Sequence, residues 1–222
     1  MIRHYFDIEQ GTPDWHNARR GVLTSSAVKT LITPTGKLAD NEKVRAKVYE
    51  VAAERLTGRS EFSYQSFDMM RGHFEEIRAR DLYGGAVQCG FITHEIDGVT
   101  IGFSPDGLVG EDGLIEIKSA KARIQVERLA AGIVPPEHIA QIQTGLLVSG
   151  RAWCDFISFG NGMPMMVVRV LADAAYHAMI VEAAKRFESQ VAMVIAAYLA
   201  NSEGCKVAEY MEEITDEINT IQ

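Results

Sequence analysis

Apolar residues in the first third of the chain recur with the period of an α-helix. In residues 41–57 they return every three or four positions, which places them on one helical face. Capping and turn residues mark further helical segments in this region. Together these signals predict helices from about Pro13 to Gly21, from Thr24 or Ser25 to Ile32, over 41–57 and over about 67–84.

The period changes at residue 86, where short β-branched runs separated by glycine begin. These runs predict antiparallel strands over 86–96, 98–104, 106–110 and 113–119. The rest of the chain is predicted to form, in order, helix 137–149, strand 153–160, strand 165–171 and a helix over about 173–199. This order predicts an α+β fold, in which one mixed sheet is flanked by helices and an N-terminal helical region packs on it.

The composition is that of an ordinary globular protein, with 47 % apolar and 23 % charged residues among 222. No apolar run approaches the roughly 20 residues that span a bilayer. The N-terminal segment lacks the apolar core of a signal peptide, so we expect a cytoplasmic protein without membrane contact. Cys89, Cys154 and Cys205 lie far apart without a CxxC spacing, which disfavours a disulfide framework or a cysteine-ligated metal.

Charge is distributed unevenly along the chain. Lys and Arg number 22 and Asp and Glu number 30, which gives a net charge of −8. Residues 1–60 carry a net charge of +3, whereas 61–170 carry −5 and 171–222 carry −6. This distribution is compatible with one surface that faces DNA and another that is turned away from it. A solvated acidic helix at the end of an ordinary domain is the alternative explanation.

The candidate chemistry lies between Ser104 and Lys118, where two short strands meet at a Gly-Glu-Asp-Gly turn. The hairpin returns Asp106 close to Glu116, and the alternation along the second strand places Glu116 and Lys118 on one face. Two carboxylates beside an ammonium group suit Mg²⁺ or Mn²⁺, which holds a phosphate and lowers the pKa of a bound water. The alternative explanation is a solvated Glu-x-Lys pair that follows an ordinary Pro-Asp-Gly turn.

The order Asp106, then Glu116-Ile117-Lys118 after a hairpin, resembles the PD-(D/E)xK nuclease signature. Further segments are similar to the lambda-type phage recombination exonucleases, the YqaJ-like viral recombinase family. The similar segments, which follow the order and spacing of that family over roughly residues 10–170, are Trp15–Ser26, Gly72–Tyr83, Ser104–Leu108, Leu114–Lys118 and Ala140–Gln143. The resemblance implies a restriction-endonuclease-like core.

The resemblance also implies an active site with Mg²⁺, for which Mn²⁺ could substitute, and with two ions. Asp106, Glu116 and the backbone carbonyl of Ile117 would be metal ligands, and Lys118 would position and activate water. Glu76 would approach the metals from its helix, although pairing with Arg80 four residues later is the alternative role.

Two glutamines of the Ala-Gln-x-Gln segment are further candidates by resemblance. Gln143, and with less support Gln141, would line the cleft near the scissile phosphate. The alternative role for each is that of a helix residue that caps the end of a strand.

A pocket for a terminal 5′-phosphate is implied for Arg19, Ser26 and Ser104. A guanidinium fork and hydroxyl donors favour an anion, so the assignment is chemically sensible. Met69 or Met70 could be an apolar wedge that separates the last base pairs, although methionines at this spacing more often belong to a core.

Members of the family form ring-shaped trimers around duplex DNA, and the chain is therefore expected to be a homotrimeric ring that works with a single-strand annealing protein. The expected function is 5′-to-3′ digestion of one strand of linear duplex DNA by a single nuclease domain. Its parts would be a helical 5′-end-binding region at about 10–60, a catalytic core at about 67–170 and a C-terminal helical region at about 171–222. One departure is the loop 33–38, in which Lys37 is the only charge.

Two other functions stay open on the sequence. One is an endonuclease of the same fold, which needs no pocket for a terminal phosphate. The other is a catalytically silent module that binds DNA ends or docks a partner. The presence of Asp106, Glu116 and Lys118 disfavours the silent module.

Overall fold

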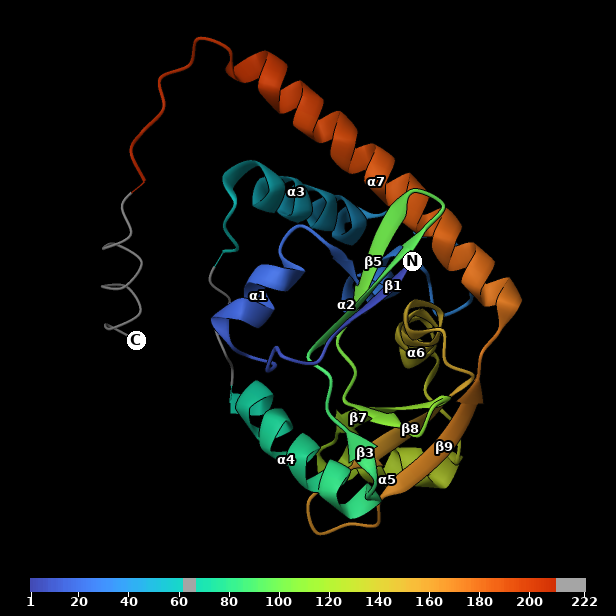
Figure 1. Cartoon of the computed structure of the whole chain (residues 1–222). Helices are drawn as coiled ribbons and strands as arrows, with labels where there is room; N and C mark the ends of the chain where they lie inside the picture. The colour runs from blue at the N-terminus through green and yellow to red at the C-terminus, as the bar shows by residue number, and fades with distance from the viewer. Residues whose placement is uncertain (62–66, 211–222) are drawn as a thin grey trace.

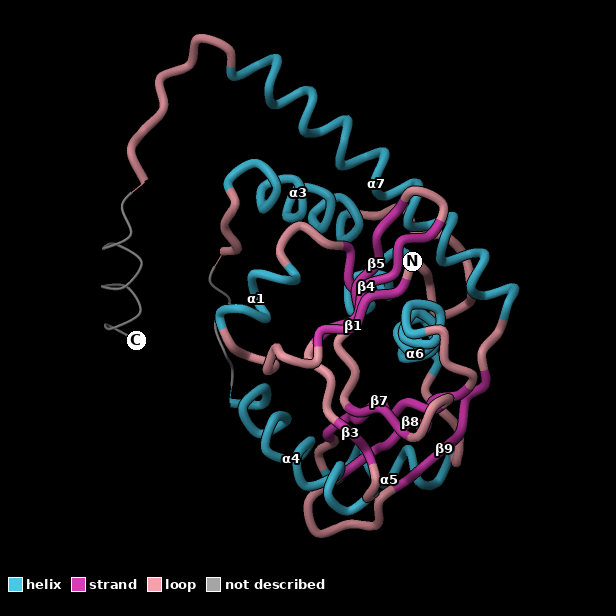
Figure 2. Tube along the Cα trace, viewed as in Figure 1, coloured by secondary structure: helices cyan, strands magenta, loops and turns pink. Residues whose placement is uncertain are grey.

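A computed structural model describes residues 1–61 and 67–210. Within these residues the chain forms two sheets and seven helices (Figures 1 and 2). The helices are α1 (Pro13–Arg19), α2 (Ser25–Leu31), α3 (Glu42–Thr57), α4 (Phe67–Tyr83), α5 (Ala122–Ala131), α6 (Pro136–Ser149) and α7 (Ala174–Ser202). The predicted C-terminal helical region extends to residue 222, but 211–222 lie outside the described residues.

The first sheet has the strand order β1-β4-β5-β2, in which β2 pairs with β5 in parallel and the other pairs are antiparallel. Its strands are β1 (Ile2–Tyr5), β2 (Leu23–Thr24), β4 (Phe91–Ile96) and β5 (Val99–Phe103). Helices α2, α6 and α7 pack against this part of the molecule, and α3 lies along α7 (Figure 1).

The second sheet has the order β3-β6-β7-β8-β9, in which only β7 and β8 are parallel. Its strands are β3 (Ala86–Val87), β6 (Gly107–Val109), β7 (Gly113–Ser119), β8 (Trp153–Phe159) and β9 (Met166–Leu171). Helix α4 covers one side of β7 and β8, and α5 and α6 contact β8.

The predicted helices and most of the predicted strands are confirmed, but the expectation of one sheet is wrong. The run 86–96 divides into β3, which joins the second sheet, and β4, which joins the first. Gly90 lies at this division, where an added Cβ would be 1.9 Å from the carbonyl oxygen of Ile8. Two backbone segments thus approach closely at the point where the run divides.

Three elements were not predicted. Strands β1 and β2 are short, and their pairing depends on β4 and β5, which lie far away in the sequence. Helix α5 buries only Gln125, so its sequence lacks a strong apolar stripe. The local sequence signal for this helix is Gly132, which ends it as a C-cap in the left-handed conformation.

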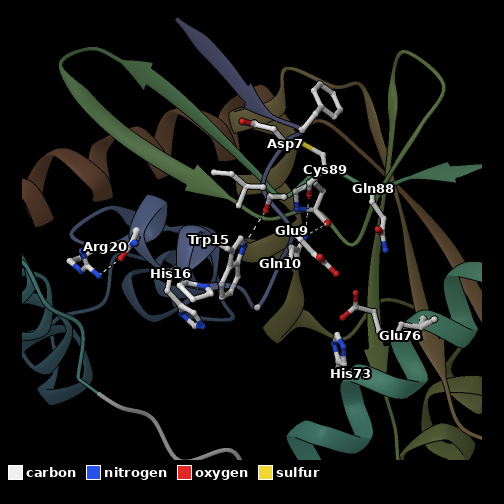
Figure 3. Close-up of a pocket in the computed structure, with 18 of the residues that line it drawn as sticks. Asp7, Glu9, Gln10, Trp15, His16, Arg20, His73, Glu76, Gln88 and Cys89 are labelled. Atoms are coloured by element: carbon white, nitrogen blue, oxygen red, sulfur yellow. Dashed lines mark hydrogen bonds between the residues drawn. The ribbon is translucent and has the colours of Figure 1, made fainter. Parts of the chain in front are cut away.

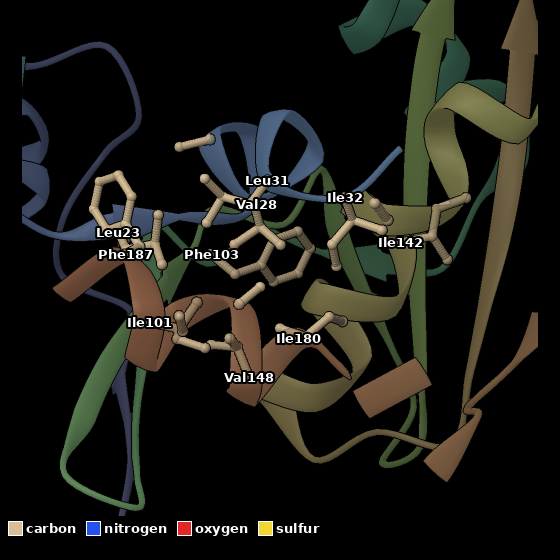
Figure 4. Packing of buried hydrophobic residues seen from close by; sticks show 14 of the residues in the cluster. Leu23, Val28, Leu31, Ile32, Ile101, Phe103, Ile142, Val148, Ile180 and Phe187 are labelled. Atoms are coloured by element: carbon tan, nitrogen blue, oxygen red, sulfur yellow. The ribbon is translucent and has the colours of Figure 1, made fainter. Parts of the chain in front are cut away.

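Two apolar clusters hold the fold together. The larger lies among α2, α3, α6, α7 and residues of both sheets, and includes Leu23, Val28, Ile101, Phe103 and Phe187 (Figure 4). The smaller lies between α4 and the second sheet and consists of Ala79, Ile115, Ile117, Ile157 and Phe159. This smaller cluster packs the face of β7 that carries Ile115 and Ile117, whereas Glu116 and Lys118 lie on the other face beside Leu114 of the larger cluster.

Candidate active site

The β6–β7 hairpin brings the predicted carboxylates together. Gly107 pairs with Ile115, so Asp106 lies opposite the next residues of β7. Its Oδ2 accepts a hydrogen bond of 2.6 Å from the backbone N–H of Ile117. The Nζ of Lys118 lies 2.5 Å from Oε1 of Glu116, whose side chain is 2 % exposed. The structure therefore unites the buried Glu116 with the half-buried Asp106 and Lys118 in one cluster.

Burial and like charge dominate the electrostatics of this cluster. Burial, with the neighbouring Glu116 and Glu76 carboxylates, raises the pKa of Asp106 well above its ordinary value, although Lys118 and the Ile117 N–H oppose the shift. Burial alone would lower the pKa of Lys118, but the Glu116 and Asp106 carboxylates outweigh it and the pKa rises. The cluster thus carries more negative charge than its own lysine balances.

Both carboxylate oxygens of Glu116 are buried without a hydrogen-bond partner. The close contact with Lys118 is an ion pair whose geometry does not meet that of a hydrogen bond. Buried carboxylates are normally paired, hydrogen-bonded or bound to a metal. The donor set of Asp106, Glu116 and the Ile117 carbonyl consists of the hard oxygens that Mg²⁺ and Mn²⁺ prefer. These residues therefore fit a divalent cation.

Glu76 of α4 belongs to the electrostatic cluster but is turned toward Arg80. Its Oε1 accepts a hydrogen bond of 2.5 Å from Nη2 of Arg80, and Nε of Arg80 donates to the carbonyl oxygen of Asp106 at 2.6 Å. Burial, opposed by Arg80 and His73, raises the pKa of Glu76. Among the described residues, no three Asp, Glu, His or Cys side chains converge in the arrangement of a metal site. The predicted alternative, the pair with Arg80, is thus the arrangement that the structure contains.

Glu75 precedes Glu76, so the choice between them is a matter of helical register. The carboxylate of Glu75 accepts hydrogen bonds from Ser119 and, at 3.0 Å, from Arg71. Only Glu76 of the two acts on the pKa of Asp106. Of the two glutamates, Glu76 is therefore the one whose charge acts on the carboxylate cluster.

A cleft of about 1320 Å³ opens beside the cluster, between the N-terminal segment, α4 and the loop before β4. Figure 3 shows Glu76 and His73 pointing from α4 into this cleft, toward the segment that carries Glu9 and Gln10. Gln10 ties that segment to the active-site loop, because its Nε2 donates to the carbonyl oxygen of Pro105 at 2.8 Å. Met69 also lines the cleft and is 54 % exposed, so it is not a core residue.

Arg19 and Ser104, two of the three residues of the predicted phosphate pocket, are in contact. Nη1 of Arg19 donates to Oγ of Ser104 at 2.8 Å, and Nε1 of Trp15 donates to the same oxygen at 2.9 Å. The guanidinium of Arg19 stacks 4.1 Å from the centre of the Trp15 ring. Burial lowers the pKa of Arg19 to about 10, against the opposing effect of Glu54. Ser26 is exposed, and its Oγ instead lies 3.1 Å from Oγ1 of Thr24.

Gln143 occupies the capping role that was its alternative. The side chain is 3 % exposed, its Nε2 donates to the carbonyl oxygen of Leu171 at 2.8 Å, and its Oε1 accepts from the N–H of Asp173 at 3.0 Å. Both ends of the amide therefore join the end of β9 to the start of α7. Gln143 does not line the cleft described above, and Gln141 is half-buried on the same helix.

The sequence alone assigned no role in the site to Trp15 or His138, and it indicated Arg80 only as a partner of Glu76. Arg80 anchors the backbone at Asp106, and Trp15 shares Ser104 with Arg19. His138 of α6 stacks on Phe156 of β8, and the charge of Lys118 acts on it. Trp15 stood in a segment already singled out, so it could have been found, whereas the contacts of Arg80 and His138 depend on the tertiary structure.

A mixed sheet whose hairpin presents Asp106 and Glu116-x-Lys118 beside a cleft defines a fold of the PD-(D/E)xK nuclease type. The model of the YqaJ-like viral recombinase domain matches residues 14–152. The chain therefore belongs to the YqaJ-like viral recombinase family.

Solved structures resemble this chain over most of its length. The alkaline exonuclease LHK-Exo from Laribacter hongkongensis is 30 % identical with a TM-score of 0.73, over 88 % of this chain and 100 % of that one. A complex of LHK-Exo with dAMP is 31 % identical with a TM-score of 0.72 over the same shares. A phage-related exonuclease from Haemophilus somnus 129PT shares the fold, at 14 % identity and a TM-score of 0.57, over 79 % of this chain and 96 % of that one. A search of curated proteins found no match.

No helix within the described residues combines the length and the apolar character that crossing a membrane requires.

Proposed function

We propose that this protein is a metal-dependent deoxyribonuclease that digests one strand of linear duplex DNA from its 5′ end. The observation that carries the proposal is the buried Glu116 carboxylate, without hydrogen-bond partners, beside Asp106 and Lys118 in a chain of this family. Burying a carboxylate without hydrogen bonds is costly, and the single lysine beside Glu116 and Asp106 offsets only one of the two carboxylate charges, so a bound cation would stabilise the cluster.

Asp106, Glu116 and the Ile117 carbonyl would hold Mg²⁺, and Glu76 would join them at a second ion. A bound divalent cation would hold the scissile phosphate and lower the pKa of a water molecule. Mn²⁺ prefers similar oxygen ligands and would substitute. Lys118 would orient the attacking water and offset the charge that develops on the phosphorus. The Ile117 N–H keeps Asp106 in place for this role.

The direction of digestion rests on the pocket of Arg19 and Ser104. Ser104 lies two residues before Asp106, so a 5′-phosphate held there would put the adjoining phosphodiester near the carboxylates. Arginine suits a phosphate because its planar fork donates two parallel hydrogen bonds. Each cut would release a 5′-mononucleotide and expose a new 5′-phosphate. The similar structure of LHK-Exo with dAMP is a complex with such a nucleotide.

We further propose a homotrimeric ring in the cytoplasm of a bacterial host, which passes the 3′ overhang to a single-strand annealing protein. A ring retains duplex DNA by enclosing it, so the net charge of −8 is no obstacle. Support comes from exposed apolar side chains suited to subunit contacts, namely Phe67 and Phe74 on α4 and Met193, Tyr198 and Leu199 on α7.

The test measures release of acid-soluble nucleotide with Mg²⁺ from linear 5′-phosphorylated duplex and from covalently closed circles. We expect release from the linear duplex alone, and a loss of about a hundredfold or more in Lys118→Ala. Lys43→Ala, an exposed lysine on α3, is the matched control and should act like the wild type. Efficient cutting of closed circles would support an endonuclease instead. No release from either substrate would support a silent end-binding module.

A further inference from the structure

The backbone of Gly21 is held on both sides by helix α3. Its N–H donates to Oε2 of Glu54 at 2.7 Å, and its carbonyl oxygen accepts from Nε of Arg55 at 2.8 Å. Gly21 is buried and has a φ of +69°, the left-handed region that glycine adopts without strain. A Cβ at this position would lie 2.9 Å from Cγ of Arg55. Two consecutive side chains of α3 therefore clamp the backbone of one residue, through the peptide groups on either side of the Gly21 Cα.

This clamp lies next to the phosphate pocket. Gly21 follows Arg19 by two residues, and the N–H of Val22 closes a turn on the carbonyl oxygen of Arg19 at 3.1 Å. The carboxylate of Glu54 also acts on the Arg19 guanidinium, where it opposes the lowering of the pKa by burial. Glu54 thus influences Arg19 through the backbone turn and through its charge.

Helix α7 fixes the other side of the clamp. Nη1 and Nη2 of Arg55 donate to the two carboxylate oxygens of Glu188, at 2.6 Å and 2.8 Å. Such a bidentate pair orients the guanidinium as a rigid fork. Because Arg55 uses its Nε on Gly21 at the same time, α7 restrains the turn that carries Arg19.

We propose that Glu54 and Arg55 are positioning residues, which set where Arg19 presents its guanidinium to the 5′-phosphate of the DNA end. The inference rests on the proposed function, because it assumes that Arg19 binds that phosphate. The half-buried Arg19 contacts the Ser104 hydroxyl and the aromatic faces of Trp15 and Phe91. Its direction toward an anion therefore depends on the backbone that precedes Gly21.

Substitution separates the two influences of Glu54. Glu54→Gln keeps an oxygen that can accept from the Gly21 N–H and removes the charge that competes with phosphate for Arg19. Glu54→Ala removes both. If positioning is the role, Glu54→Gln keeps the preference for phosphate and Glu54→Ala loses it.

The experiment measures kcat/KM for nucleotide release from duplexes with a 5′-phosphate and with a 5′-hydroxyl, and the ratio is the readout. We expect the ratio to fall about tenfold or more in Glu54→Ala and to stay at or above the wild-type value in Glu54→Gln, since misplacement by about 1 Å can cost a hundredfold. Arg55→Lys keeps the charge but cannot reach Gly21 and Glu188 as one fork, so its ratio should also fall. Glu50→Ala, one turn earlier on α3, is the control and should keep the ratio.

Both substrates are measured on one preparation, so a uniform loss of folded protein cancels in the ratio. The reference variant is Arg19→Ala, which should abolish the preference for a 5′-phosphate. If it does and the ratio in Glu54→Ala stays at the wild-type value, the inference is overturned. Should Glu54→Ala fail to fold, an unchanged ratio in Arg55→Lys overturns it instead. Equilibrium binding of 5′-phosphorylated and 5′-hydroxyl duplexes in EDTA gives the same comparison without catalysis. Failure of the proposed function is distinct, because the wild type would then release no nucleotide or show no preference.

Discussion

Acidification from pH 8 to pH 5 should destabilise the protein through His138 on α6. Nε2 of His138 lies 3.1 Å from Nη2 of Arg128, and a guanidinium can only donate, so this ring nitrogen accepts and the imidazole is neutral. Burial, followed by the positive charges of Lys118, Arg128 and Lys29, lowers its pKa from 6.5 to about 3. Protonation of His138 would remove the hydrogen-bond acceptor of Arg128 and add a positive charge beside Lys118, Arg128 and Lys29.

The sign follows from a folded-state pKa that lies below the unfolded one. The contribution of His138 to stability is complete above pH 6.5 and is lost as the pH falls toward 3. At pH 5 the imidazole of His138 is charged in the unfolded protein and neutral in the folded protein. The difference of 1.5 pH units between 6.5 and 5 corresponds to about 2 kcal/mol. This figure holds for any folded pKa below about 4, so it depends mainly on the unfolded value.

Urea denaturation of the wild type and of His138→Gln at pH 8, 7, 6 and 5 measures this contribution. Glutamine keeps an acceptor for Arg128 but does not titrate. We expect the wild type to lose about 2 kcal/mol more than His138→Gln between pH 8 and pH 5. His16→Gln, at an exposed position on α1, is the control and should follow the wild type. Parallel curves for the wild type and His138→Gln would refute the assignment.

Three further predictions concern packing, capping and metal. Gln143→Leu should lower the free energy of unfolding by about 1–3 kcal/mol, because the Leu171 carbonyl and the Asp173 N–H lose their partner. Nucleotide release per folded molecule should stay unchanged. A loss of release without a loss of stability would show that Gln143 acts in the active site. Gly113→Ala should lower the melting temperature, since its Cβ would lie 2.2 Å from the Trp153 ring; an unchanged temperature contradicts the packing. Mg²⁺ at about a hundredfold its Kd should stabilise the wild type by about 2.7 kcal/mol in thermal unfolding, and Glu116→Gln by much less; equal stabilisation would exclude Glu116 as a ligand.

Local chemistry determined what the sequence predicted correctly. The Gly-Glu-Asp-Gly turn sets the register of the β6–β7 hairpin, so the approach of Asp106 to Glu116 follows from a few adjacent residues. Helix α3 is similarly local, because Asn41 caps its start and the left-handed Gly58 ends it. These features depend on interactions within one turn or one hairpin.

Only the tertiary structure decided the features that join distant segments. Arg19 meets Ser104 across 85 positions, and Arg55 meets Glu188 across 133. The division into two sheets falls where Gly90 approaches Ile8, a contact between distant segments that no local propensity encodes. Gln143 carried a motif suited to the cleft, yet the packing of α6 against β9 and α7 directed its amide to their backbone. The sequence thus determined which groups are available for the chemistry, because periodicity and turn chemistry act over a few residues. Long-range packing determined which of those groups meet.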